Sequence, residues 1–120
     1  MDVATMLKTA TILLALTAAG GLLMAIMRFS GADRPPSWIA MAHGLLAGAG
    51  LTLLLYAGFV GGIAATGWAG IVLLAVAALA GTYLNLAYHA KLLPLPKATV
   101  MLHALVAVAG FLLIAWTAFK

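Results

Sequence analysis

Two histidines, sixty residues apart, are the residues of this chain best suited to chemistry. His43 lies in the segment MAHGLLAGAG (41–50), and His103 lies in the similar segment MLHALVAVAG (101–110). Each histidine comes near the start of a long apolar run, with alanine four residues later and glycine seven residues later. That spacing places the three residues on one face of a helix. We expect a flat ligand to lie against this face.

The composition indicates a membrane protein. Of the 120 residues, 67% are hydrophobic and 7% are charged, and the mean hydropathy is +1.23. Four apolar runs cover residues 5–29, 37–59, 67–89 and 98–119. Each is close to the roughly 20 residues that cross about 30 Å of hydrocarbon. We therefore predict an all-α membrane protein with four transmembrane helices in an up-down bundle, forming one domain over residues 1–120.

The loops carry most of the charge. The segment 31–37 contains two prolines, which end one helix, and Ser37, which is placed to cap the next one. A second proline-containing loop follows residue 89, and a short turn at 61–68 joins the middle helices. The two proline loops and their flanks hold four of the six basic residues: Arg28, Arg34, Lys91 and Lys97.

This charge distribution is typical of a topology signal rather than of a nucleic-acid-binding surface. The positive-inside rule predicts the proline loops in the cytoplasm and both termini outside. We expect an integral protein of a bacterial inner membrane, in contact with lipid and with no nucleic-acid partner. The chain has no cysteine, which excludes disulfides and covalently attached haem of the CxxCH type.

An internal repeat relates the two halves of the chain, about 1–60 and about 61–120. In the segment 38–59, eight residues are identical to those sixty positions later: Met41, His43, Leu45, Ala47, Ala49, Gly50, Leu53 and Phe59. Each repeat contains two helices, so both copies enter the membrane in the same direction. The second and fourth helices should then lie diagonally opposite, with the two histidines at equal depth.

This arrangement favours one bis-histidine haem b. A bundle diagonal is on the order of 12 to 14 Å, which leaves room for one iron between imidazoles from His43 and His103. Arg28 and Arg34, with the two loop lysines, are placed to pair with the haem propionates. Space for the macrocycle is expected beside four small residues: Ala47, Gly50, Ala107 and Gly110.

A polar stripe near the end of the third helix breaks the symmetry. Thr82, Asn85 and His89 follow one another at about one helical turn, and Tyr88 lies beside them. The stripe is suited to a quinone carbonyl, to a haem propionate or to a plain hydrogen bond between helices. A copper or zinc site made by all three histidines fits less well, because helical rise puts His89 about 9 Å nearer the interface.

Several activities are excluded because the residues that they need are missing from the sequence. The acidic residues are Asp2 and Asp33, and neither lies within a span. A proton-coupled exporter of this size would need an intramembrane carboxylate, and Ser-His-Asp catalysis would need an acid beside a histidine.

Small residues at helical spacing, such as Gly44 and Gly48, also have a simpler interpretation as helix-packing contacts.

With its four spans, its histidine pair and the small neighbours of that pair, the chain resembles small four-helix b-type cytochromes and the haem-holding anchor subunits of respiratory dehydrogenases. The resemblance is one of architecture. It implies that His43 and His103 are axial haem ligands and that electrons pass between a partner and membrane quinone. A second histidine pair, which a transmembrane relay between two haems would need, is missing.

Two other functions are compatible with the sequence. One is a cofactor-free structural or assembly subunit, which uses its glycine and alanine faces to associate with other membrane subunits or with further copies of itself. The other is a chlorin-binding subunit, in which each histidine ligates the magnesium of a separate pigment. An absorption spectrum separates these functions.

Overall fold

A computed structural model describes all residues from Met1 to Lys120, and the chain is entirely helical. The first helix, α1, covers Val3–Phe29. The second, α2 (Ser37–Tyr56), continues into a π-helical turn, η1 (Ala57–Gly61), and the third, α3 (Ala65–Leu84), continues into another, η2 (Asn85–His89). The last helix, α4, covers Lys97–Phe119.

The four predicted spans are confirmed, and their bounds agree with the apolar runs to within two residues. All four helices are long and apolar enough to cross a membrane, so the chain is an integral membrane protein in contact with lipid. Large hydrophobic side chains are exposed along every helix, as expected where the surrounding solvent is hydrocarbon.

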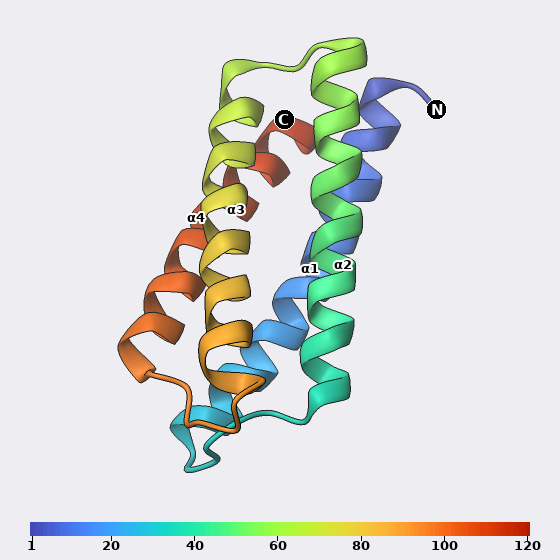
Figure 1. Cartoon of the computed structure of the whole chain (residues 1–120). Coiled ribbons are helices and arrows are strands. Elements are labelled where there is room, and N and C mark those ends of the chain that lie inside the picture. The colour runs from blue at the N-terminus through green and yellow to red at the C-terminus, as the bar shows by residue number, and fades with distance from the viewer.

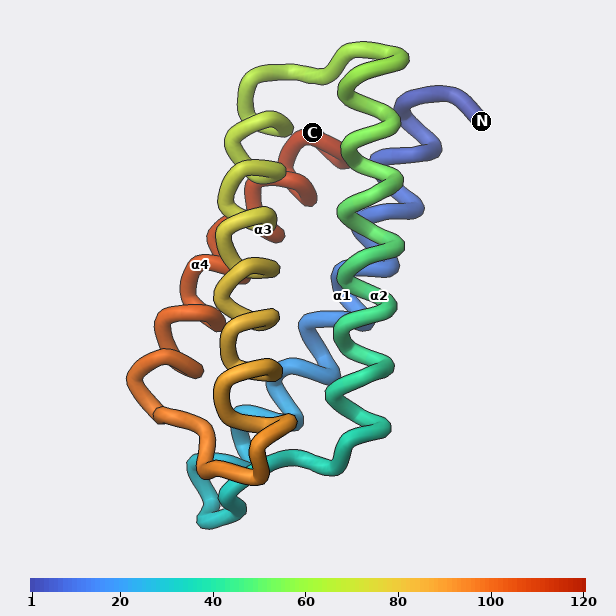
Figure 2. The backbone as a smooth tube through the Cα atoms, in the orientation of Figure 1, coloured from blue at the N-terminus to red at the C-terminus, as the bar shows by residue number.

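The helices run alternately up and down, as Figure 1 shows. The helix α1 packs closely against α2, and α3 packs closely against α4; α1 also contacts α4, whereas α2 and α3 touch more lightly. The predicted diagonal arrangement of α2 and α4 is therefore present. Both termini lie at the end of the bundle opposite the loops 30–36 and 90–96 (Figure 2).

Proline precedes α2 and α4, and an acidic residue caps α1. Asp2 caps α1, because its Oδ1 accepts a hydrogen bond from the Thr5 amide at 2.7 Å, and this bond holds the pKa of the Asp2 carboxyl below its usual range. The prediction that Ser37 caps α2 is wrong. Pro36 occupies the cap position without a side-chain hydrogen bond, and the Ser37 hydroxyl lies 3.2 Å from His89 Nε2 instead.

The turn between the middle helices is shorter than predicted. It covers residues 62–64, and Gly62 adopts a φ of 76° there, a conformation that glycine reaches without a steric penalty. Thr66 already belongs to α3, where its hydroxyl lies 2.8 Å from the Thr117 hydroxyl of α4.

The hydrophobic core fills the half of the bundle nearer the termini. It contains side chains from all four helices: Leu7, Ala10, Leu14, Leu54, Ile71, Leu74 and Ile114. Leu54 and Ile114, sixty residues apart, are both fully buried. Leu84, Leu95 and Val100 form a second, smaller cluster near the proline loops. The two clusters leave the middle of the loop-side half without a buried apolar core.

Two arginines tie the proline loops together. Arg28 Nε donates to the carbonyl oxygen of Leu95 at 2.7 Å, and Arg34 Nη1 donates to that of Leu92 at 2.8 Å. The Leu95 amide in turn donates to the Asp33 carbonyl at 3.0 Å. These bonds hold the α1–α2 connection against the α3–α4 connection and so close the loop end of the bundle.

Candidate functional site

A cavity of about 930 Å³ occupies the half of the bundle between the core and the proline loops. All four helices contribute to its wall, and the three histidines of the chain are among the lining residues. Its volume lies within the range of about 300 to 1,000 Å³ that is usual for small-molecule and cofactor sites. The wall is largely apolar, so the few polar groups that face the cavity decide what it can hold.

His43 and His103 make the same kind of hydrogen bond to a neighbouring helix. His43 Nδ1 lies 2.8 Å from the carbonyl oxygen of Thr17 in α1, and His103 Nδ1 lies 2.8 Å from that of Ala77 in α3. A carbonyl oxygen only accepts, so each Nδ1 must carry the hydrogen. In the neutral imidazole the other nitrogen, Nε2, is then a lone-pair donor, which is the form that binds a metal.

A glycine lies under each imidazole. A Cβ added at Gly21 of α1 would come within 2.9 Å of His43 Cε1, and one added at Gly81 of α3 would come within 3.0 Å of His103 Cε1. Each ring is therefore packed against helix backbone, at a distance that a side chain would prevent. Gly20, by contrast, would bring its Cβ no nearer than 3.9 Å to His43.

The two imidazoles come close together inside the bundle. Their ring centres are 6.2 Å apart, and their planes meet at 71°. A metal ion binds an imidazole nitrogen at about 2 Å, and that nitrogen lies about 1 Å from its ring centre, so two rings that share one metal have centres roughly 6 Å apart. Both planes can contain a common N–metal–N axis at any mutual angle. The donor set and the spacing thus fit one shared metal.

The polar stripe lines the same cavity. Thr82, Asn85 and His89 all belong to its wall, together with Ser37, whose hydroxyl lies within hydrogen-bond distance of His89. The Thr82 hydroxyl donates to the Ala78 carbonyl in its own helix at 2.8 Å. Asn85 and His89 begin and end the π-helical turn η2, a distortion that often occurs at functional sites.

Tyr88, the fourth residue of the predicted stripe site, points elsewhere. Its ring packs edge-on against Tyr83, and the two hydroxyls are 3.4 Å apart. The cavity wall does not include Tyr88. It belongs instead with the small cluster around Leu84 and Leu95.

The four small residues expected beside a macrocycle divide into two pairs. Ala47 and Ala107 line the cavity. Gly50 and Gly110 are buried outside it, where they allow close helix contacts: Gly50 lies against Leu14 of α1, and Gly110 lies against α3. The structure therefore gives these two glycines a packing contact.

Arg28 and Arg34 lie at the loop end of the cavity but not in its wall. Two hydrogens of the Arg28 guanidinium and one of Arg34 are donated to loop carbonyls. The remaining guanidinium hydrogens of both residues are the donors left for an anionic group. No set of three or more histidine or acidic side chains is close enough together to hold a bare metal ion, so His89 does not join the other two histidines.

Sequence reasoning missed four residues of this site: Thr17, Ala77, Gly21 and Gly81. Thr17 and Ala77 contribute only backbone oxygen, which no sequence pattern reports. Gly21 and Gly81 could have been found from the sequence, because they are both glycine and are sixty positions apart, like the two histidines. A search for glycines that recur with the histidines, one on each neighbouring helix, would have identified them.

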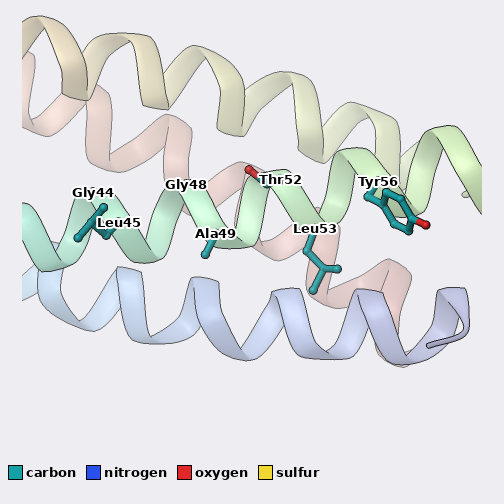
Figure 3. A pocket seen from close by; sticks show the side chains of 7 residues that line it. All are labelled: Gly44, Leu45, Gly48, Ala49, Thr52, Leu53 and Tyr56. Carbon is teal, nitrogen blue, oxygen red and sulfur yellow. The ribbon is translucent and has the colours of Figure 1, made fainter.

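A shallow groove along α2 shares Gly44, Leu45 and Gly48 with the cavity wall. Figure 3 shows the residues that line it along α2, with Gly44 and Leu45 at one end and Tyr56 at the other. A Cβ added at Gly44 or Gly48 would meet no atom within 4 Å. These two positions are therefore suitable controls for substitutions at the buried glycines.

Comparisons with protein-family models, with curated proteins and with solved structures found no match to this chain. The geometry of the site is therefore the basis for a functional assignment.

Proposed function

We propose that this protein is a b-type membrane cytochrome in which His43 and His103 hold one haem iron, and that it exchanges electrons with a lipid-soluble quinone. The observation that carries the proposal is the pair of opposed imidazoles, 6.2 Å apart between ring centres and each bonded through Nδ1 to a backbone carbonyl. Both rings thereby keep Nε2 available to the cavity.

The residues around the pair suit haem better than an isolated metal ion. Two neutral imidazoles supply no negative charge, and neither a carboxylate nor a thiolate lies in the cavity wall. A structural zinc site needs four protein ligands. Haem iron is already bound by the four porphyrin nitrogens and would need only two ligands from the protein, which is the number of histidines in this pair. The apolar wall, with Ala47 and Ala107 beside the histidines, would accept a macrocycle.

We also propose that the two halves of the chain are tandem two-helix repeats. The imidazole–carbonyl bonds support this, because Thr17 and Ala77 are sixty residues apart, as are the two histidines. The glycines beneath the rings have the same offset. Repeats related by an axis along the membrane normal would present two equal ligands to one metal on that axis.

When bound, haem supplies reversible one-electron oxidation and reduction. The side chains of the polar stripe provide a hydrogen-bond donor and a proton-transfer group for a bound quinone. Asn85 offers an amide to a quinone carbonyl, and His89 can give or take a proton at a ring nitrogen, assisted by the Ser37 hydroxyl at 3.2 Å. Since these groups share one cavity with His43 and His103, an electron would have a short path.

This assignment implies partners and a location. With one histidine pair, the chain accommodates one haem, so a transmembrane electron path would require another subunit or a second copy. A bacterial inner membrane, with the proline loops in the cytoplasm, fits the charge distribution.

A spectrum of the purified protein tests the proposal. We expect one low-spin haem b per chain after expression with haem, visible as a dithionite-induced band. His43→Ala and His103→Ala should each abolish that band or convert it to a high-spin form, whereas His89→Ala should retain it. An unchanged low-spin spectrum in both single variants would refute the ligand assignment.

The same measurement separates the alternatives. Chlorin bands in the red would indicate a pigment-binding subunit. The absence of any chromophore, together with failure to bind added haemin, would indicate a cofactor-free structural or assembly subunit.

A further inference from the structure

We propose that Gly21 and Gly81 are positioning residues that set the tautomer of the two histidines. By leaving the carbonyls of Thr17 and Ala77 open, they hold both imidazoles in the Nδ1–H form with Nε2 turned toward a ligand. The use of these nitrogens for haem rests on the proposed function, but the tautomer itself is a property of the chain without any cofactor.

The argument begins with the position of each glycine. Gly21 follows Thr17 by four residues, and Gly81 follows Ala77 by four. In an α-helix the carbonyl of residue i accepts from the amide of residue i+4, and the Cβ of that later residue leans back toward the helix N-terminus. A side chain at position 21 or 81 would therefore lie beside the carbonyl that the imidazole uses.

The distances show that the approach depends on the missing Cβ. At Gly21 an added Cβ would be 2.9 Å from His43 Cε1 and 3.4 Å from Nδ1, and at Gly81 the values for His103 are 3.0 and 3.6 Å. The ring would have to turn away, and a turned ring loses the 2.8 Å bond from Nδ1. Because Cε1 lies between the two nitrogens, the same movement redirects Nε2.

The tautomer matters because the bundle offers nothing else to select it. A neutral imidazole in water populates both tautomers, and a carbonyl acceptor at Nδ1 selects the one with a bare Nε2. Without the bond, a proton on Nε2 would block ligation there. Loss of the hydrogen bond that orients a ligating histidine typically weakens metal binding about 10- to 100-fold.

The test uses imidazole ¹⁵N NMR of the cofactor-free, full-length protein in detergent micelles, because protonated and bare ring nitrogens have very different shifts. Signals are assigned by removing one histidine at a time. In the unsubstituted chain, we expect His43 and His103 both to be protonated at Nδ1. A bare Nδ1 on either ring would overturn the proposal without recourse to any variant.

Two glycine variants then test the cause. Gly21→Ala should convert His43 to a tautomer mixture and leave His103 unchanged, and Gly81→Ala should do the reverse. Gly20→Ala is the matched control, since its added Cβ would make only an ordinary 3.9 Å contact with His43. An unchanged tautomer in both Gly21→Ala and Gly81→Ala, or an equal change in Gly20→Ala, would contradict the positioning role.

A haemin titration of the same variants separates this proposal from the proposed function. We expect Gly21→Ala and Gly81→Ala to bind haemin 10- to 100-fold more weakly than the Gly20→Ala control. If the unsubstituted chain has the expected tautomers but binds no haemin, the cytochrome assignment fails and the positioning role remains. If haemin binds and the ring tautomers are the same in all variants, the positioning role fails and the cytochrome assignment remains.

Discussion

Substituting Gly110 by alanine should destabilise the bundle more than the same substitution at Gly50. The two glycines are equivalent in the sequence, but their surroundings differ. A Cβ at Gly110 would lie 2.9 Å from Leu74 Cγ, 3.1 Å from the Gly70 carbonyl oxygen and 3.1 Å from Leu73 Cβ. The last two atoms are fixed to the backbone of α3, so α3 and α4 would have to separate.

A Cβ at Gly50 would mainly contact a flexible side chain rather than backbone. It would lie 2.9 Å from Cγ and Cδ2 of Leu14, while the nearest backbone atom, the Ala10 carbonyl oxygen, is 3.6 Å away. A change of the Leu14 rotamer relieves this contact, at a cost of about 1 kcal/mol. Overpacking against backbone costs about 1 to 3 kcal/mol, and we place Gly110→Ala near the upper end of that range.

The gain in helix propensity is common to both variants and cancels in their comparison. The expected difference of about 2 kcal/mol corresponds to a roughly 30-fold larger unfolding constant for Gly110→Ala. Unfolding by sodium dodecyl sulfate in mixed micelles, followed by circular dichroism, measures it, and Gly48→Ala serves as the control with open space around its Cβ. Equal stability of the two variants, with haem lost from both, would show that these glycines make room for a macrocycle instead.

Three further predictions concern the loops and the stripe. Asp33→Cys should be protected from a membrane-impermeant maleimide in intact cells and Ala64→Cys should be labelled; the opposite pattern would reverse the orientation derived from the basic loops. Arg28→Gln removes the 2.7 Å charged bond to the Leu95 carbonyl and should cost about 1.5 kcal/mol, measured by the same detergent unfolding, with faster proteolysis of both proline loops; unchanged stability would mean that the bond contributes nothing. His89→Leu should slow quinol-dependent haem reduction or quinone-dependent haem oxidation while bound haem stays near one per chain; loss of haem in this variant would show that the stripe anchors the cofactor.

Three features of the structure do not follow from local sequence patterns. Ser37 has the residue type of a cap, yet it is the first residue of α2 and Pro36 occupies the cap position, while its hydroxyl lies 3.2 Å from His89 Nε2. The π-helical turn at Asn85–His89 was not foreseen, since helical periodicity assumes regular turns. The hydrogen bonds of Arg28 and Arg34 to loop carbonyls depend on how two distant loops meet, which charge alone does not predict.

The sequence by itself determined the spans, their alternation, the common end of both termini, and the histidine pair on α2 and α4. These features follow from the lengths of apolar runs, from helix-ending prolines and from spacing within one helix, all of which are local. The tertiary structure decided which carbonyl each imidazole bonds, which glycines lie beneath the rings, and which small residues line the cavity rather than a helix contact. Those outcomes depend on the rotation and crossing of helices relative to one another, and many crossings satisfy the same apolar pattern, because every face of these helices is apolar enough to meet either lipid or protein.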